Sequence, residues 1–220
     1  MSYQHRFVDQ TPCNLPVGKA VCVGRNYAAH AAELNNPVPE RPILFIKPRT
    51  AIVDLLQPLK LPTQWGAAHH ETELVVLIGE TLTHADEAQA KQAIAGYGIG
   101  LDLTLRDLQN QLKEKAHPWE IAKAFDGAAP LSPFVKPDQI PDPQQVEIKL
   151  EVNGVVKQQG AASDMLNPVI PLIAYMSQFF TLEPGDVIFT GTPAGVGPLQ
   201  AGDQLKLSIV GVLEVETQVA

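Results

Sequence analysis

The sequence predicts a mixed α/β fold that is rich in strands, and three observations support this fold class. The 19 prolines and 16 glycines are spread along all 220 residues, which favours short elements and tight turns over a helical bundle. Short apolar runs with many β-branched residues recur between the turns, as strands require. Two alternating runs flank Asn153-Gly154, a pair typical of a type I′ hairpin. With 45% hydrophobic residues, we expect one domain over residues 1–220.

The charge balance excludes several classes of partner. The chain has 16 basic and 24 acidic residues, which gives a net charge of -8, and no Lys/Arg cluster follows the spacing of a phosphate backbone. The N-terminal segment is too polar for a secretory signal, and no apolar run approaches the roughly 20 residues that span a bilayer. We therefore expect a cytoplasmic protein that binds neither nucleic acid nor membranes.

The first third of the chain predicts a strand, a helix and two further strands. The apolar run at 20–24 ends in glycine and suits a strand, and Asn26 is then expected to cap a helix over 27–34. On that helix His30 and Glu33 are neighbours. Two further apolar runs, ILFIKP and HHETELVVLIGE, are typical of strands.

The rest of the chain continues the mixture of short elements. The segment 87–95 predicts a helix, and GYGIGLDLTLRD combines a strand with a helix start at which Thr104 and Asp107 have the spacing of a capping pair. After the hairpin, Asn167 and Pro168 predict the start of a helix that continues to about residue 180. The C-terminal segment alternates short strands with Gly, Pro and Asp turns.

Three carboxylates are candidate ligands for a metal ion. Glu71 and Glu73 lie at i and i+2 on an expected strand, so both side chains leave the same face, with Cα atoms about 6–7 Å apart. Two carboxylates this close repel each other, and the apolar run that follows them makes their charged forms costly. A bound cation would keep both carboxylates ionised. Oxygen-only ligands favour Mg²⁺ or Mn²⁺. The spacing alone also fits the solvated face of an edge strand. Asp102 interrupts an apolar stretch and needs a partner, for which Arg106 is an alternative to a metal.

Three more residues could carry acid–base or electrostatic chemistry. His30 and Glu33 can form an imidazole–carboxylate pair that activates water, although a solvated helix face explains the same spacing. Lys123 is interpreted as the one lysine between aromatic and apolar neighbours, where it could bind an anion, or else extend along the surface. His69 and His70 are adjacent on a strand, so they point to opposite faces and are not assigned to the metal.

Several ordered blocks of sequence resemble the fumarylacetoacetate hydrolase family, and especially its small single-domain branch of acylpyruvate hydrolases and oxaloacetate decarboxylases or tautomerases. These blocks are VGRNYAAHAAEL, PILFIKP, HHETELVVLIGE, GYGIGLDLTLRDLQ, PWEIAKAFD, VNGVVKQQG and LIAYMSQFFTLEPGDVIFTGTPAGVGPLQAGD. The resemblance implies a rolled β-sandwich with peripheral helices, assembled as a homodimer.

The resemblance also implies roles for individual residues. Glu71, Glu73 and Asp102 would bind Mg²⁺ or Mn²⁺. His30, Glu33 and Lys123 would be catalytic, the first two on a lid that orders over the substrate. Four further positions match contacts to the substrate's carboxylate and oxo groups in relatives: Arg25, Arg106, Gln109 and Thr192.

The activity that the resemblance implies is hydrolysis of acylpyruvates, in which the C–C bond of a 2,4-dioxo acid breaks and a pyruvate enolate leaves. Decarboxylation of oxaloacetate would proceed through the same enolate. The alternative is an isomerase, either an oxaloacetate keto–enol tautomerase or a 2-hydroxyhepta-2,4-diene-1,7-dioate isomerase. A more remote alternative is a metal-binding module without catalysis, for which the pair of His30 and Glu33 has no use.

Overall fold

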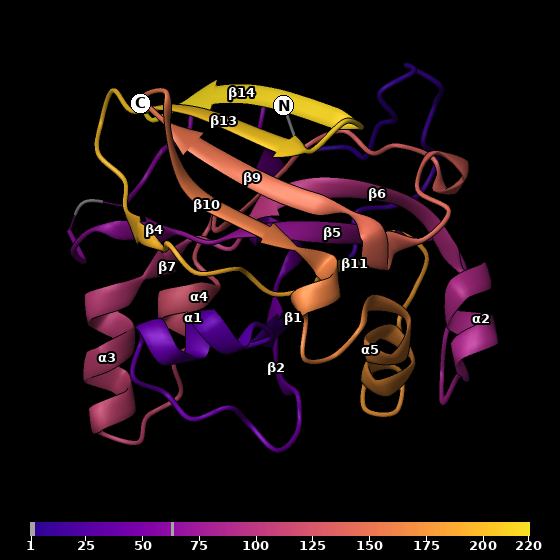
Figure 1. Cartoon of the computed structure of the whole chain (residues 1–220), viewed down its shortest axis with the longest axis horizontal. Helices are drawn as coiled ribbons and strands as arrows, with labels where there is room; N and C mark the ends of the chain where they lie inside the picture. The colour runs from indigo at the N-terminus through magenta and orange to yellow at the C-terminus, as the bar shows by residue number, and fades with distance from the viewer. Residues whose placement is uncertain (1–2, 63) are drawn as a thin grey trace.

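A computed structural model describes residues 3–62 and 64–220, and strands dominate its architecture (Figure 1). Within these residues the largest sheet has seven strands. In spatial order they are β2 (Ile43–Lys47), β1 (Ala20–Gly24), β11 (Val187–Phe189), β5 (Thr72–Ile78), β6 (Ile94–Leu101), β8 (Ala129–Leu131) and β3 (Ile52–Asp54). Strands β1 and β11 are parallel, whereas β5 is antiparallel to both of its neighbours, β11 and β6.

Two smaller sheets complete the strand layers of the described chain. A four-stranded sheet has the order β10 (Val155–Ala161), β9 (Glu147–Val152), β13 (Gln204–Ile209) and β14 (Leu213–Gln218). A three-stranded sheet is formed by β12 (Gly197–Pro198), β4 (Ala68–His70) and β7 (Thr104–Leu105). The predicted hairpin joins β9 to β10, and both Asn153 and Gly154 have positive φ, as a type I′ turn requires.

The helices lie at the periphery of these sheets (Figure 1). They are α1 (Ala28–Glu33), α2 (Glu87–Gln92), α3 (Arg106–Glu114), α4 (Glu120–Lys123) and α5 (Val169–Met176). Single 3₁₀ turns occur at Arg49–Ala51, Pro137–Gln139, Pro143–Gln145 and Ala162–Asp164. The strand-rich α/β prediction is confirmed. Among the described residues, no helix is both long and apolar enough to cross a membrane.

The core lies on both faces of β5, which explains its uninterrupted apolar sequence. Leu74, Val76 and Ile78 point into the larger apolar cluster, which includes Leu150 of β9 and Leu207 of β13. The alternate residues of β5 enter a second cluster on the opposite face. A strand buried on both faces needs apolar residues at every position. Strand β9 has one buried face only, and its residues alternate between buried and half-buried.

Three predicted helix caps are wrong. Tyr27 and not Asn26 precedes α1, and the Asn26 amide donates to the carbonyl of Thr190 at 2.8 Å. Asn167 does not cap α5, because its backbone and side chain both donate to Asn26. Thr104 lies in β7, and its hydroxyl donates to the carbonyl of Asp102. Each side chain thus bonds to a group outside the helix that it was expected to cap.

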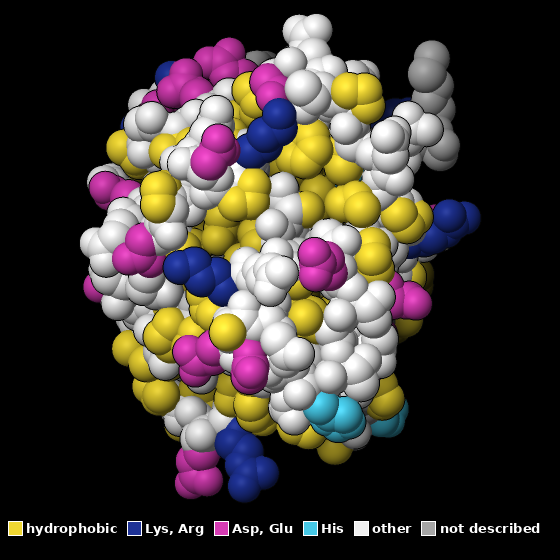
Figure 2. Space-filling model, turned by 90° about the vertical axis from the view of Figure 1, so that its right-hand side faces the viewer, with side chains coloured by type: hydrophobic (Ala, Val, Ile, Leu, Met, Phe, Trp, Pro, Cys, Tyr) yellow, Lys and Arg dark blue, Asp and Glu magenta, His cyan; other side chains and the backbone are white. Residues whose placement is uncertain are grey.

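The surface carries its charges in a dispersed arrangement. Figure 2 shows one face, on which lysine and arginine side chains stand apart among acidic, polar and apolar ones. On this face, the described residues form no continuous basic stripe of the kind that follows a nucleic-acid backbone.

Candidate active site

The three candidate metal ligands meet in the interior of the large sheet, where β5 begins and β6 ends. Because β5 and β6 are antiparallel, the start of one lies beside the end of the other, and the backbone N–H of Asp102 donates to the carbonyl of Glu71 at 2.8 Å. One carboxylate oxygen from each of Glu71, Glu73 and Asp102 lies within 4.8 Å of the others, and all three residues are buried. The alternative of a solvated edge strand is wrong, because β5 lies in the middle of the sheet.

Glu73 is held by the end of a third strand. Strand β11 runs antiparallel to β5 on its other side, so the residues after β11 reach the start of β5. There the Gly191 N–H donates to the Glu73 carboxylate at 2.6 Å. Gly191 has φ +98, and a Cβ there would lie 2.6 Å from the Cβ of Asn26. Burial, the neighbouring Asp102 and then Glu71 hold the pKa of Glu73 well above its usual range.

Glu71 and Asp102 differ from Glu73 in having cationic partners. Lys123 Nζ lies 2.8 Å from Glu71 Oε2 and 2.7 Å from Asp102 Oδ2, and Arg106 donates to Glu71. The predicted alternative, in which Arg106 is the partner of Asp102, is therefore wrong, because Arg106 binds Glu71. Burial alone would raise the pKa of Glu71, but Lys123 and Arg106 outweigh it and the net shift is downward. For Lys123, burial acts to lower the pKa, yet Asp102 and Glu71 raise it overall. Lys123 is thus a permanent cation at neutral pH.

A second buried lysine was missed. Lys47, at the end of β2, is fully buried, and its Nζ lies 2.8 Å from Asp102 Oδ1 and donates to the carbonyls of Lys123 and Leu103. The ammonium is close to Asp102 Oδ1 but outside hydrogen-bonding geometry, so this oxygen has no hydrogen-bond partner. The interpretation of Lys123 as the one lysine in an apolar setting is therefore wrong. The apolar run ILFIK before a proline was the available signal.

His30 and Glu33 lie on α1 beside the carboxylates. His30 Nδ1 is 3.4 Å from one carboxylate oxygen of Glu33, and the other oxygen accepts the Gly195 N–H at 3.0 Å. His30 is buried, whereas the Glu33 side chain is 31% exposed. The backbone of Gly195 therefore fixes Glu33, and Glu33 in turn orients the imidazole.

A cavity of about 410 Å³ brings most of the predicted site residues together. Of these residues, its wall includes Arg25, His30, Glu71, Glu73, Arg106, Gln109, Lys123 and Thr192. Glu33 and Asp102 are not part of the wall but contact residues that are. Lys113 was missed, although it follows Gln109 by one helical turn on α3 and also lines the cavity. A volume in this range suits a small molecule.

Gln158 holds the loop after β11 against β4 and β5. It is 1% exposed, although its neighbours on β10 are exposed, because a register shift between residues 156 and 158 interrupts the pairing with β9. Its Oε1 accepts from the Thr72 N–H at 3.0 Å and lies 2.9 Å from His70 Nδ1. Its Nε2 donates to Thr192 Oγ1 at 2.7 Å and to the carbonyl of Pro193 at 2.9 Å. Every hydrogen-bonding capacity of the amide is used.

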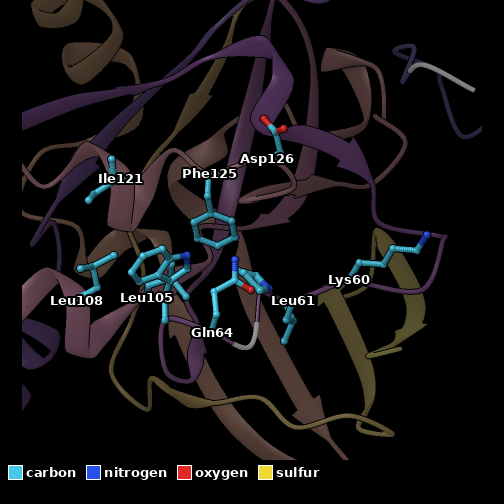
Figure 3. Close-up of a pocket in the computed structure, with 10 residues that line it drawn as sticks. Lys60, Leu61, Gln64, Leu105, Leu108, Ile121, Phe125 and Asp126 are labelled. Atoms are coloured by element: carbon cyan, nitrogen blue, oxygen red, sulfur yellow. The ribbon is translucent and has the colours of Figure 1, made fainter.

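A larger hollow of about 580 Å³ lies on the other side of α3 and α4, and its chemistry is different (Figure 3). The residues labelled in the close-up are largely apolar, with Leu105, Leu108, Ile121 and Phe125 around the hollow. The described residues of its wall include neither an imidazole nor the cluster of carboxylates. The smaller cavity is therefore the candidate site for acid–base and metal chemistry.

The donor set of the carboxylate cluster fits a divalent cation. It offers oxygen atoms only, which suits Mg²⁺ or Mn²⁺. Within the described chain, Glu73 has no lysine or arginine within salt-bridge distance, and one oxygen of Asp102 has no hydrogen-bond donor. A bound cation would supply the counter-charge that Glu73 lacks and favour its ionised form, while the same Asp102 oxygen also lies beside the Lys47 ammonium. Glu71, Glu73 and Asp102 are the residues that would hold it.

Comparisons with known proteins point to one family. The profile described as Fumarylacetoacetate (FAA) hydrolase C-terminal matches residues 19–220. An oxaloacetate tautomerase of Escherichia coli (strain K12) is 54% identical over 210 residues, which cover 95% of this chain and 96% of the relative. A crystal structure of a fumarylacetoacetate hydrolase family protein from Yersinia pestis CO92 superposes with TM-score 0.97 at 50% identity, covering 99% of this chain and all of the other. Fumarylpyruvate hydrolase from Pseudomonas aeruginosa, in complex with Mn²⁺ and pyruvate, superposes with TM-score 0.93 at 38% identity, covering 100% of this chain and 97% of the other.

Proposed function

This chain belongs to the fumarylacetoacetate hydrolase family of enzymes, and from that premise we propose that it is a divalent-metal-dependent tautomerase that interconverts enol and keto oxaloacetate. The sequence alone favoured acylpyruvate hydrolysis, with the tautomerase as the alternative. We now place the tautomerase first and acylpyruvate hydrolysis second. The relative named oxaloacetate tautomerase is 54% identical over nearly the whole chain, which supports this order.

The observation that carries the proposal is the arrangement of His30 and Glu33. Among the described residues that line the cavity, His30 is the only histidine. If its Nδ1 carries a proton that faces Glu33, its Nε2 is unprotonated and can accept a proton from the substrate. One carboxylate oxygen of Glu33 lies near His30 Nδ1 and the other accepts the Gly195 N–H, so Glu33 orients the imidazole. Tautomerisation moves one proton between the enol oxygen and the neighbouring carbon C3, and a single imidazole can accept it at one atom and donate it at the other.

The other residues would bind the substrate and stabilise negative charge. Bound Mg²⁺ or Mn²⁺ supplies a Lewis acid that favours negative charge on the 2-oxo oxygen. Arg106 and Gln109 line the cavity beside the carboxylates and can donate hydrogen bonds to the substrate's 1-carboxylate. Lys123, held as an ammonium between Glu71 and Asp102, adds a fixed positive charge close to the developing enolate. In the enol-to-keto direction, His30 Nε2 would accept the enol O–H proton and return it to C3, so that no net proton is gained or lost.

The second candidate is hydrolysis of the C–C bond of an acylpyruvate. Fumarylpyruvate hydrolase, which superposes on this chain over its whole length, favours this candidate. The same enolate would leave, but a water must first be activated and attack the distal carbonyl. His30, oriented by Glu33, would accept the proton of that water.

The two candidates are separated by assays on the same preparation. With Mg²⁺, the protein should accelerate the decay of the ultraviolet absorbance of enol-oxaloacetate, and a chelator should abolish the effect. His30→Ala should slow the reaction by about 10²-fold or more, whereas His117→Ala, at an exposed position outside the cavity, should match wild type. Release of pyruvate from acetylpyruvate without acceleration of the oxaloacetate reaction would establish the hydrolase instead. Absence of both activities would refute the proposal.

Three expectations about the cellular context are carried forward as proposals. We propose a homodimer, a cytoplasmic location and no nucleic-acid partner. Analytical ultracentrifugation tests the first directly, because a monomer at micromolar concentration would contradict it.

A further inference from the structure

Two cations in the wall of the catalytic cavity have no acidic partner. Lys123 and Arg106 bind the carboxylates of Glu71 and Asp102. Arg25 and Lys113 also line the cavity, but neither forms a salt bridge or a side-chain hydrogen bond with any described residue. Cations that face one cavity without counter-ions repel each other and attract an anionic ligand.

Lys113 extends a row of polar groups along one face of α3. Arg106, Gln109 and Lys113 occur at i, i+3 and i+7, so they lie on successive turns of the same face. The Cα of Lys113 is then about 10 Å from that of Arg106 along the helix axis. Because helical side chains lean towards the N-terminus, the Lys113 ammonium is directed back over Gln109. Arg106 and Gln109 are buried, whereas Lys113 is exposed, so this row runs from the bottom of the cavity to its opening.

Arg25 is placed by an unusual backbone conformation. It follows the end of β1 with φ 57, in the left-handed region that non-glycine residues rarely adopt. The next residue, Asn26, is fully buried and bonds to Thr190 and Asn167, which fixes the chain here. A strained conformation that its neighbours enforce is typical of functional sites. Arg25 and Lys113 line the same cavity of about 410 Å³, and the charge of Arg25 contributes, after burial and Arg106, to the lowered pKa of Lys113.

We propose that Arg25 and Lys113 form a second anion subsite near the opening of the cavity, which binds the distal carboxylate of a 2-oxo dicarboxylate. The inference rests on the proposed function, in which the 1-carboxylate and 2-oxo oxygen face the inner residues. The subsite would determine the substrate class. A four- or five-carbon 2-oxo acid that ends in a carboxylate would be bound at both ends, whereas a 2-oxo acid that ends in a methyl group would be bound at one end only.

The test compares two ligands that differ only at the distal end, 2-oxoglutarate and 2-oxopentanoate, by calorimetric titration in Mg²⁺. Wild type should bind 2-oxoglutarate at least about 10-fold more tightly, as expected for charge-assisted hydrogen bonds. Lys113→Met should reduce this preference at least about fivefold by weakening 2-oxoglutarate binding alone, and adding Arg25→Met should remove it. The matched control is Lys115→Met, two residues further along at an exposed position outside the cavity, which should keep the preference.

Several results would overturn the subsite. These are an unchanged preference in Lys113→Met, equal losses for both ligands, or no preference or no binding in wild type. Melting temperatures of the variants identify any loss that comes from unfolding. If the preference disappears as expected but oxaloacetate is not converted, the proposed function fails and the subsite stands. If oxaloacetate is converted while Lys113→Met keeps the full preference, only the subsite fails.

Discussion

Gln158→Leu should destabilise the protein markedly, although the residue lies outside the candidate active-site cavity. Leucine would leave the Thr72 N–H and the Pro193 carbonyl without partners, at a cost of about 1–3 kcal/mol each. Burial of the leucine side chain would offset about 1–2 kcal/mol. We therefore expect the free energy of unfolding to fall by about 2–3 kcal/mol, which corresponds to a melting temperature lower by about 4–12 °C at this chain length.

Chemical denaturation followed by circular dichroism measures this loss, with Gln159→Leu as the matched control. Gln159 is the next residue on β10, and its side chain is exposed, so its replacement should change the unfolding free energy by less than about 0.5 kcal/mol. Folded Gln158→Leu should also bind Mg²⁺ more weakly, because the loop that carries Gly191 loses its bonds to β4 and β5. If the two leucine variants unfold at the same denaturant concentration, the reasoning about the buried amide is refuted.

Further predictions concern the metal site, the loop and the N-terminal segment. Glu73→Gln should lose the rise in melting temperature that Mg²⁺ gives wild type, whereas exposed Glu80→Gln should keep it; a full rise in both would contradict the ligand assignment. Gly191→Ala should lower the unfolding free energy by about 1–3 kcal/mol, since φ +98 and the close Cβ of Asn26 leave no room for alanine; wild-type stability would show that the loop relaxes. Burial holds the pKa of His5 below its usual value of 6.5. As the pH is lowered, His5 is therefore protonated in the unfolded chain before it is protonated in the folded protein. The free energy of unfolding then decreases as the pH decreases, by up to about 1.4 kcal/mol per pH unit. Between pH 7.5 and 5.5 wild type should lose more unfolding free energy than His5→Phe, and equal losses would exclude this role.

The position of the carboxylates could be predicted from sequence because strand geometry determines it. The i, i+2 spacing of Glu71 and Glu73 places both on one face of β5, and the charged interruption of an apolar run indicated Asp102. The order of motifs along the chain then indicated His30 and Lys123, which line the same cavity. Their catalytic roles remain predictions.

The helix caps could not be predicted, because long-range bonds determine the conformation of those residues. Asn26 and Asn167 have good capping propensity, yet they bond to each other across 141 positions of sequence. Nothing local distinguishes an asparagine that caps a helix from one that joins two distant loops.

Lys47 and Gln158 were missed for a related reason. A lysine after a strand and a glutamine in an alternating run are normally exposed, and burial here depends on contacts that only the fold creates. Lys47 is beside Asp102 because β2 lies next to α4. Gln158 turns inward because of a shift in strand register that has no sequence signature.

The central claim is that Glu71, Glu73 and Asp102 hold a divalent cation on which the enolate chemistry of a 2-oxo acid depends. The most direct test is the turnover of oxaloacetate and acetylpyruvate, measured side by side for wild type and Glu73→Gln, with Mg²⁺ and with a chelator. We predict that wild type with Mg²⁺ converts oxaloacetate, and that both the chelator and Glu73→Gln abolish this activity while the protein stays folded. Undiminished conversion in the presence of the chelator, or by Glu73→Gln, would contradict the claim.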